Sequence, residues 1–376
     1  MTFRIPLFDL NFDDREHNAV TEALNSRWIS MGPRVEAFER AFCGVLNGEH
    51  AVATSSGTAA LHLALRILDI GAGDEVIVPS LTFVATINAI RYVNATPVFC
   101  DIKGAADLTV DPDLIPSLIT KNTKAILVMH YGGFPCDMAR VLAIAKKHNL
   151  QVIEDACHAP LSEYGGKKLG TLGEVGCFSF FANKTLSTGE GGMLVTSDEG
   201  LAMRARALRS HGMTTPSYDR ACGHSSSYDV TELGYNYRLD DIRAAIGIAQ
   251  LEKLPQDLIQ RARVRALYIE LLADHPRITI PFRDWRGVVS NYIFPVVLNE
   301  FSASQREHVR QKLAESGIQT SVHYPAAHRF DFYKTEDGRL PRTSYTADAE
   351  ITLPLYRSLS DEHVRDVARA LLAAIS

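Results

Sequence analysis

The larger, N-terminal part of the chain alternates short apolar runs with longer segments in which apolar residues recur every three or four positions. The apolar runs predict strands at 51–54, 75–79, 97–101, 124–130, 151–154, 177–181 and 193–196. The periodic segments predict helices at 14–26, 35–46, 58–70, 84–94, 114–119, 138–148 and 199–210. Short strands that alternate with longer helices predict an α/β fold with a doubly wound, mostly parallel sheet, which binds its ligands at the carboxyl ends of the strands.

The pattern changes near residue 241, where a long helix is predicted to begin. Beyond it the chain predicts strand-like segments at 278–280, 292–298 and 320–323, and helices at 304–317 and 363–374. These elements are typical of a smaller α+β domain. We therefore expect a large domain over residues 1–245 and a small C-terminal domain over residues 246–376, with the boundary inside the long helix.

Composition limits the classes of function. The chain has 376 residues, 46% of them hydrophobic, which is enough to bury a large core. Its net charge of −5 gives no general attraction to nucleic acid or to an anionic membrane, so neither partner is expected. The N-terminus turns acidic where a signal peptide would need an apolar centre, and the later apolar stretches are too short to span a bilayer. We expect a cytoplasmic protein.

The spacing of the cysteines does not indicate a disulfide framework. Six of them are scattered without a CxxC pair, at positions 43, 100, 136, 157, 177 and 222. Most lie in apolar surroundings, where a reduced thiol behaves as a small core residue. Neither a disulfide framework nor a metal site is expected.

One lysine stands at an informative place. Lys184 follows the apolar run 177–181, which predicts a buried strand, and it precedes a glycine-rich loop at 189–192. Burial disfavours the ammonium form of a lysine, and a neutral amine is a nucleophile that forms a Schiff base with a carbonyl. Taken alone, a lysine before a glycine loop is more often a surface residue in a turn.

A second group of small residues opens a predicted helix. Ser55, Ser56 and Gly57 form a tight turn after the strand 51–54, and the helix begins at Thr58. The N-terminus of a helix carries partial positive charge and unpaired N–H groups, so it binds phosphate well. An ordinary N-cap explains the same residues. However, Ser56, Phe83, His130, Asp155 and Lys184 all follow the ends of predicted strands, and this coincidence favours a common site.

A lysine, a carboxylate, an aromatic ring and a helix N-terminus together suit one cofactor, pyridoxal phosphate (PLP). The lysine forms the Schiff base and, once displaced by a substrate amine, acts as the base that moves a proton. The carboxylate keeps the pyridine nitrogen protonated, so the ring accepts electrons. The aromatic ring stacks on the pyridine, and the helix N–H groups hold the phosphate.

Seven sequence motifs, which follow one another along the chain, add to this interpretation. They are SSGTAALHLAL, DEVIVPSLTFVAT, EDACHA, FSFFANKTLSTGEGGM, GYNYRLDDIRAAIGIAQLE, VHYP and ITLPLY. Together they resemble the DegT/DnrJ/EryC1/StrS sugar aminotransferase family, over nearly the whole chain from about residue 6 to beyond residue 356. The resemblance implies a fold-type I, aspartate-aminotransferase-like enzyme, and a homodimer whose active sites are shared between subunits.

The resemblance also implies roles for individual residues. Lys184 matches the Schiff-base lysine, Asp155 the partner of the pyridine nitrogen, and Phe83 the ring-stacking position. His158 stands where many members have a glutamine near the phenolic oxygen of the cofactor, and an imidazole can still donate that hydrogen bond. Asn236 matches an asparagine that the neighbouring subunit delivers to the phosphate. The phosphate contacts of the chain itself match Gly57, Thr58 and Ser179, and the substrate-facing positions match His323, Tyr324 and His328.

The presence of Lys184 indicates a transaminase, because the dehydratase branch of this family has histidine at that position. We expect transfer of an amino group from L-glutamate to the ketone of a sugar, most simply a nucleotide-linked 4-keto-6-deoxyhexose, since TGEGGM resembles branches that aminate C4. Amination of a keto-octulosonate or keto-cyclitol, and a PLP-binding regulator without turnover, stay open as alternatives. An enzyme outside PLP chemistry has no support, because neither GxGxxG nor a P-loop follows a strand.

Overall fold

The computed structural model describes residues 3–214, 227–335 and 337–376. Its α-helices are α1 (Asp14–Asn25), α2 (Pro33–Leu46), α3 (Gly57–Ile67), α4 (Val84–Tyr92), α5 (Ile115–Leu118), α6 (Met138–His148), α7 (Glu199–Leu208), α9 (Asp241–Leu272), α10 (Ala303–Glu315), α11 (Pro341–Ala349) and α12 (Asp361–Ile375). Short 3₁₀ helices are η1 (Tyr131–Gly133), η2 (Ala327–Arg329), η3 (Asp331–Tyr333) and η4 (Asp337–Arg339). Its strands are β1 (His50–Thr54), β2 (Glu75–Pro79), β3 (Thr96–Cys100), β4 (Ile102–Gly104), β5 (Asp107–Val110), β6 (Thr123–Met129), β7 (Gln151–Asp155), β8 (Glu163–Tyr164), β9 (Lys167–Lys168), β10 (Val175–Ser179), β11 (Gly192–Thr196), β12 (Ile278–Thr279), β13 (Phe294–Leu298) and β14 (Glu350–Leu353).

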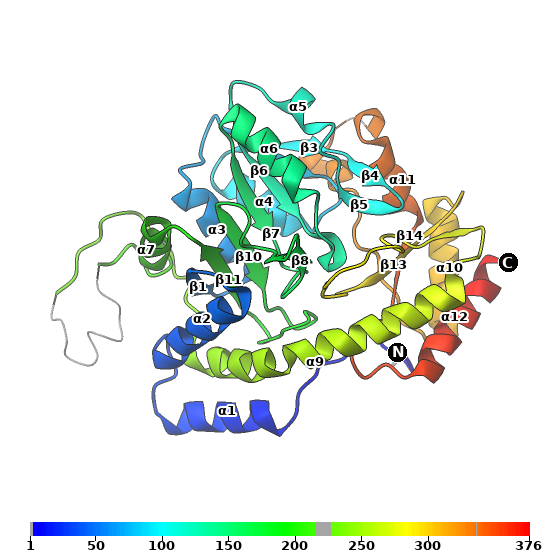
Figure 1. The fold of residues 1–376 in the computed structure, drawn as a ribbon, viewed down its shortest axis with the longest axis horizontal. Helices are drawn as coiled ribbons and strands as arrows, with labels where there is room; N and C mark the ends of the chain where they lie inside the picture. Colours follow the sequence, from blue (N-terminus) through cyan, green and yellow to red (C-terminus); the bar gives the residue numbers. More distant parts are fainter. Residues whose placement is uncertain (1–2, 215–226, 336) are drawn as a thin grey trace.

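A seven-stranded sheet forms the centre of the large domain, in the order β1-β11-β10-β7-β6-β2-β3 (Figure 1). The five strands from β10 to β3 are parallel to one another, whereas β11 runs antiparallel to both of its neighbours. The predicted α/β fold with a mostly parallel sheet is therefore confirmed. The parallel strands end together, so the loops that follow them meet at one edge.

Helices cover both faces of this sheet, which is why its strands read as continuous apolar runs. In β2, Val76 and Val78 pack with residues of α3, α4 and α7, whereas Ile77 packs with residues of α6 on the other face. The same alternation occurs in β11, where Leu194 joins the first cluster and Met193 packs toward α2 and α9. The result is a three-layer arrangement, in which the sheet lies between two layers of helices.

Some boundaries differ from the prediction. The strand predicted at 177–181 begins at Val175 and ends at Ser179, and the side chain of Phe181 is 45% exposed. The predicted strand at 320–323 is only a single bridge, between Ser321 and Thr352. The hairpins β4–β5 and β8–β9 and the helix α11 were not predicted, because their short segments carry too little apolar periodicity to stand out.

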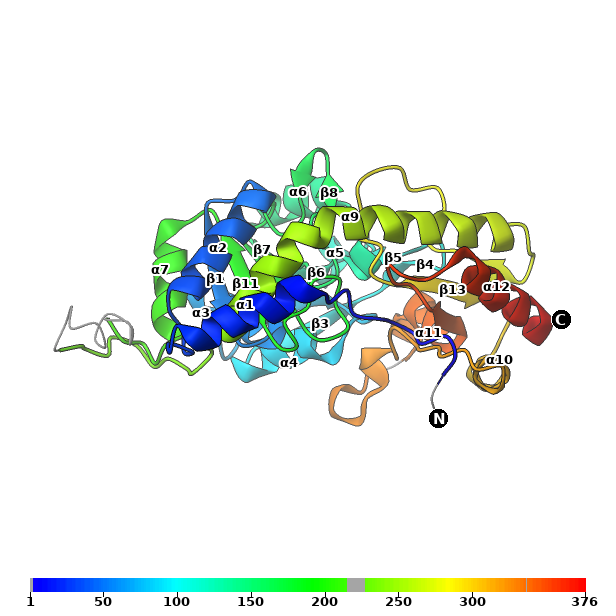
Figure 2. The ribbon, with the colours of Figure 1, turned by 90° about the horizontal axis from the view of Figure 1, so that it is seen from below.

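The second domain consists of the antiparallel sheet β12-β13-β14 with α10 and α12, and α9 connects it to the first (Figures 1 and 2). Along α9, residues Leu251 to Leu258 belong to the core of the large domain, whereas residues from Val264 onward belong to the second core. Ile5, near the N-terminus, also packs in the core of the second domain. The division at residue 245 stays a prediction, and these contacts favour a crossover between Leu258 and Val264.

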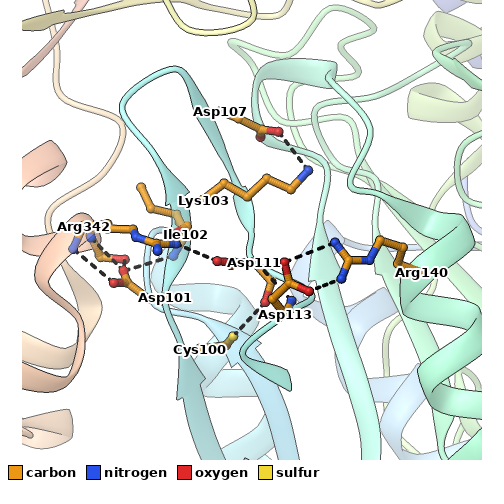
Figure 3. Close-up of polar contacts among 10 residues, drawn as sticks. Cys100, Asp101, Ile102, Lys103, Asp107, Asp111, Asp113, Arg140 and Arg342 are labelled. Atoms are coloured by element: carbon orange, nitrogen blue, oxygen red, sulfur yellow. Dashed lines mark hydrogen bonds and ion pairs between the residues drawn. The ribbon is translucent and has the colours of Figure 1, made fainter. Parts of the chain in front are cut away.

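Hydrogen bonds from the first turn of α11 to Asp101 and Asp111 hold this helix against the large domain (Figure 3). Asp101, directly after β3, is 3% exposed and accepts hydrogen bonds from the backbone N–H groups of Arg342 and Thr343, at 3.0 and 2.8 Å. These N–H groups belong to the first turn of α11, which has no partner for them within the helix. The guanidinium of Arg342 also reaches Asp111, at 2.6 Å. The carboxylates therefore set the position of α11 against the sheet.

Within the described ranges, no helix has the length and apolar character needed to cross a membrane. The same residues contain no cluster of histidine, cysteine and acidic side chains that could hold a metal ion. Five cysteines are free thiols, at positions 43, 100, 136, 157 and 177. Cys222 lies outside the described residues.

Candidate active site

A cavity of about 350 Å³ opens where the strands of the large sheet end and the second domain begins. It brings together most of the residues singled out from the sequence. They are Gly57, Thr58, Phe83, Asp155, His158, Ser179, Lys184, His323 and Tyr324. A larger depression of about 560 Å³ lies between α2 and α7, but the residues lining it include neither a lysine nor the carboxyl end of any parallel strand. The smaller cavity is therefore the candidate active site, because it contains Lys184 and Asp155.

The start of α3 forms one wall. Ser56 is the N-cap, and its hydroxyl accepts a hydrogen bond from the N–H of Ala59 at 3.1 Å. Gly57, the first residue of the helix, lies so close to β10 that a Cβ atom there would be 2.7 Å from the Cβ of Ser179. A larger residue at 57 would therefore push the turn away from Ser179. This close packing brings the helix N-terminus and the Ser179 hydroxyl together, as an anion site requires.

Asp155 lies at the end of β7 and is 3% exposed. One of its carboxylate oxygens accepts a hydrogen bond from the Thr86 hydroxyl at 2.7 Å, and the other accepts one from the N–H of Cys157 at 3.1 Å. Thr86 is itself fully buried, in the first turn of α4. Two donors therefore fix the direction of a carboxylate that lines the cavity.

Lys184 extends over the ring of Tyr292, with Nζ 4.3 Å from the ring centroid. The hydroxyl of Tyr292 donates to the side-chain carbonyl oxygen of Asn183 at 3.1 Å, which holds the ring in place. Phe83 lies on another wall, 53% exposed, with its ring centroid 5.7 Å from that of Tyr324. A flat ligand between these groups would meet an aromatic side chain, as stacking requires.

His158 is buried beside Tyr292, with the two ring centroids 4.3 Å apart. Burial, together with the nearby charge of Lys184, holds the pKa of His158 well below its usual value, so the ring is neutral. Its Nδ1 accepts from the N–H of Gly132 at 3.3 Å. The proton is then on Nε2, which donates to the Tyr324 hydroxyl at 2.8 Å.

This geometry changes the expectation for His158. Both of its ring nitrogens already have protein partners, so it has no free N–H to offer a ligand. Burial raises the pKa of the Tyr324 hydroxyl well above its usual value, so this group keeps its proton. Since Tyr324 accepts from His158, its own hydrogen is available to donate. Tyr324 is therefore the donor that this wall offers to the cavity, and the role that the family resemblance implies for His158 stays a prediction.

Two predicted residues lie apart from the cavity. His328 is fully buried and makes hydrogen bonds to the hydroxyls of Ser80 and Ser344, at 2.7 and 3.1 Å. It joins the end of β2 to α11 and does not line the cavity, and its predicted contact with the substrate stays a prediction. Asn236 is exposed, in an isolated bridge with Ser210, and does not line the cavity. Its prediction concerns a neighbouring subunit and stays a prediction.

His130, which also follows a strand, is fully buried and does not line the cavity. Its Nδ1 accepts from the N–H of Cys136, and its Nε2 lies 2.9 Å from the carboxylate of Glu154. Glu154 also accepts three backbone N–H groups, from Gly170, Leu172 and Gly173. This pair therefore orders the loop after β9 and does not serve the cavity.

The sequence analysis missed several residues that line the cavity, chiefly Thr86, Asn183, Glu190 and Tyr292. Thr86 could have been found, because it lies in the first turn of a helix that begins at a strand end. Tyr292 could not, because only the folded chain brings the second domain to Lys184.

The residues present fit pyridoxal phosphate. The start of α3 with Gly57, Thr58 and Ser179 suits the phosphate, the buried carboxylate of Asp155 suits the pyridine nitrogen, and Lys184 suits the carbonyl carbon. The cavity volume is of the size that small cofactors occupy.

Comparison with known proteins agrees with this fit. The model of the DegT/DnrJ/EryC1/StrS aminotransferase family matches residues 11–372. The spore coat polysaccharide biosynthesis protein SpsC of Bacillus subtilis (strain 168) is 39% identical over 363 residues, which is 95% of this chain and 93% of SpsC.

Solved structures give the same result. PseC of Helicobacter pylori, an aminotransferase involved in the biosynthesis of pseudoaminic acid, is 30% identical with a TM-score of 0.92, over 100% of this chain and 99% of PseC. Spr1654 of Streptococcus pneumoniae in its PLP form is 29% identical with a TM-score of 0.92, over 99% of this chain and 98% of Spr1654. The chain belongs to the DegT/DnrJ/EryC1/StrS aminotransferase family and is a PLP-dependent aminotransferase.

Proposed function

We propose that the protein transfers an amino group from L-glutamate to the ketone of a sugar, and that the sugar is a nucleotide-linked 4-keto-6-deoxyhexose. The observation that carries the proposal is the arrangement of Lys184, Asp155 and the start of α3 around one cavity. Support for a sugar comes from the names of SpsC and PseC, which belong to polysaccharide and pseudoaminic acid biosynthesis. The motif TGEGGM, which resembles branches that aminate C4, supports the position of the ketone.

Pyridoxal phosphate, when bound, supplies an electron sink for the charge that develops at the reacting carbon. Lys184 is the base that removes and returns the proton at that carbon. Asp155 would hold the pyridine nitrogen, and the hydrogen bonds from Thr86 and Cys157 keep its carboxylate aimed at the cavity. Gly57, Thr58 and Ser179 would hold the phosphate.

The remaining lining residues position these groups. Tyr292 keeps Lys184 over its ring, and the cation–π contact restricts where the amine can reach. Tyr324, with His158 behind it, offers a hydroxyl hydrogen to an oxygen in the cavity. Phe83 fixes the tilt of a flat ligand by stacking. Together these contacts orient the reacting atoms and limit the entry of water.

We also propose that the active enzyme is a cytoplasmic homodimer with shared sites. Apolar side chains near the cavity and near Asn236 are unusually exposed in the single chain: Phe83 is 53%, Phe181 45% and Leu233 77% exposed. Exposed apolar residues of this size often mark protein–protein contacts. A partner that covers them would bring its own Asn236 toward the phosphate.

The test begins with the visible absorbance of the purified protein. We expect a near-visible band that shifts to shorter wavelength when L-glutamate is added and returns when the correct keto sugar is added. In Lys184→Ala the band and the turnover should both be lost. Lys167→Ala is the matched control, because Lys167 is an exposed lysine of β9 and its loss should leave both unchanged.

A Lys184→Ala variant with full turnover would refute the proposal. If no nucleotide-linked keto sugar is accepted but a free keto-octulosonate or keto-cyclitol is, the substrate class changes to the latter. If the band is present but no amino donor alters it, the chain is a PLP-binding regulator.

A further inference from the structure

Glu350, the first residue of β14, is a carboxyl group that the mechanism above does not use. It is 1% exposed, and no ion pair to it is formed among residues 3–214, 227–335 and 337–376. Arg306 and Arg310 of α10 and Tyr131 of η1 are the other charged or titratable groups that act on its carboxyl, and Nη1 of Arg306 donates to its backbone carbonyl at 3.4 Å. Burial outweighs the hydrogen bonds and the two arginine charges and raises the pKa of Glu350 to about 8. Glu350 can therefore hold a proton near neutral pH.

A short chain of hydrogen bonds connects Glu350 to the cavity. Its Oε1 lies 2.5 Å from the Thr352 hydroxyl, and that hydroxyl lies 2.9 Å from Nδ1 of His323. Its Oε2 accepts from the backbone N–H of His323 at 2.8 Å, which fixes the two residues relative to each other. His323 lines the cavity, and its Nε2 makes no hydrogen bond within the described residues.

The single hydrogen of Thr352 couples the two ends of this chain. When Glu350 is a carboxylate, the Thr352 hydroxyl donates to it and accepts from Nδ1–H of His323, so Nε2 of His323 is bare. When Glu350 is protonated, its O–H donates to Thr352, whose hydroxyl donates to Nδ1, so the imidazole proton is on Nε2. His323 is neutral in both arrangements, and they differ by one proton.

His323 does not hold an extra proton by itself. Burial, with the charge of Lys184, lowers the pKa of His323 to about 3. The rings of Tyr292 and Tyr324 pack against it, and His158 is the other histidine that faces it. An imidazolium is therefore disfavoured at this place, whereas a protonated Glu350 is not.

We propose that Glu350 is the proton store of His323, linked to it through Thr352. A proton that reaches Nε2 of His323 from the cavity is matched by transfer of the Nδ1 proton to Thr352 and of the Thr352 hydroxyl proton to Glu350. The reverse movement returns a proton to the cavity. Lys184 is the cationic group that faces the relay, and a part for the relay in the reaction rests on the proposed function. Glu350 and Thr352 are positioning residues, since they act through His323.

The first experiment follows the tautomer of His323 by nitrogen-15 NMR in the purified protein. Raising the pH through about 8 should move the imidazole proton from Nε2 to Nδ1 without an imidazolium signal. His328 is an internal control, because it is also buried but its ring nitrogens contact the hydroxyls of Ser80 and Ser344 instead of Thr352, and its signals should not move with this midpoint.

Three variants separate the relay from a structural role. In Glu350→Gln the amide mimics the protonated acid, so His323 should keep its proton on Nε2 at every pH. In Thr352→Val the link is removed, so the tautomer should no longer follow Glu350, whereas Thr352→Ser should restore the transition. The rate of the half-reaction with L-glutamate should fall by about tenfold or more in Glu350→Gln and Thr352→Val and lose its dependence on pH near 8.

A wild-type tautomer that does not change with pH overturns the relay, even in a fully active enzyme. So does a Glu350→Gln variant that keeps the transition. If the tautomer follows Glu350 but L-glutamate changes nothing in the wild type, the proposed function fails and the relay stands as a proton-binding pair.

Discussion

The hydrogen bond from Thr86 to Asp155 offers a sharp test of how the cavity is built. Replacing Thr86 with Val keeps the shape of the side chain and removes the hydroxyl. Asp155 then keeps only the N–H of Cys157 as a donor, while it stays 3% exposed. Thr82, which contacts the Thr86 hydroxyl at 2.9 Å, retains its contact with the sulfur of Met129. The substitution therefore costs a hydrogen bond mainly at the carboxylate of Asp155.

A hydrogen bond to a charged group contributes about 1.5–3 kcal/mol. The methyl group that replaces the hydroxyl recovers less than about 1 kcal/mol through burial of apolar surface. We expect Thr86→Val to lower the free energy of unfolding by about 2 kcal/mol. Because the same bond directs Asp155 into the cavity, we also expect the dissociation constant of PLP to rise by roughly tenfold or more.

The assays are urea unfolding of the protein without cofactor and absorbance titration with PLP. Thr86→Ser is the control, because it keeps the hydroxyl and should lose less than half as much on both measures. If Thr86→Val binds PLP as tightly as the wild type, then Thr86 does not direct Asp155, and the reasoning about this wall of the cavity is wrong.

Three further predictions follow from the structure. Gly57→Ala should weaken PLP binding by about tenfold or more in an absorbance titration, because its Cβ would lie 2.7 Å from that of Ser179. Asp101→Ala should lower the unfolding free energy by about 1–3 kcal/mol in urea, because it leaves the first N–H groups of α11 without a partner. Burial raises the pKa of Glu350 from 4.5 to about 8, so its protonated form stabilises the wild type fully below about pH 4.5, and this stability is lost as the pH rises through about 8. Glu350→Gln should therefore make the free energy of unfolding, measured in urea, depend less on pH in this window.

The sequence alone predicted the sheet well because both of its faces are buried. A strand such as β2 is apolar at every position, and the helices beside it have one apolar stripe, so each type leaves a clear signal. The end of β10 was less clear. Phe180 and Phe181 continue the apolar run, but Phe180 is buried under α2 while Phe181 is 45% exposed, and pattern alone does not separate the two.

From the sequence, only those site residues could be predicted that follow the end of a strand. Thr86 and Asp155 are 69 positions apart, and Glu350 reaches the cavity only through Thr352 and His323. One signal was present in the sequence, because Glu350 is a single charge that opens the apolar run of β14. A buried strand position rarely holds a carboxylate without a reason.

The charge of the residues that line the cavity supports the proposal that a second subunit completes the site. Burial keeps His158 and His323 neutral, so Lys184 is the one cationic side chain among the described residues that line the cavity, where Asp155 and Glu190 are carboxylates. The helix N-terminus at Gly57 supplies only about half an elementary charge toward a phosphate. Further donors from a neighbouring chain would lower the electrostatic cost of the phosphate, and exposed Asn236 is a residue of the right chemistry to provide them.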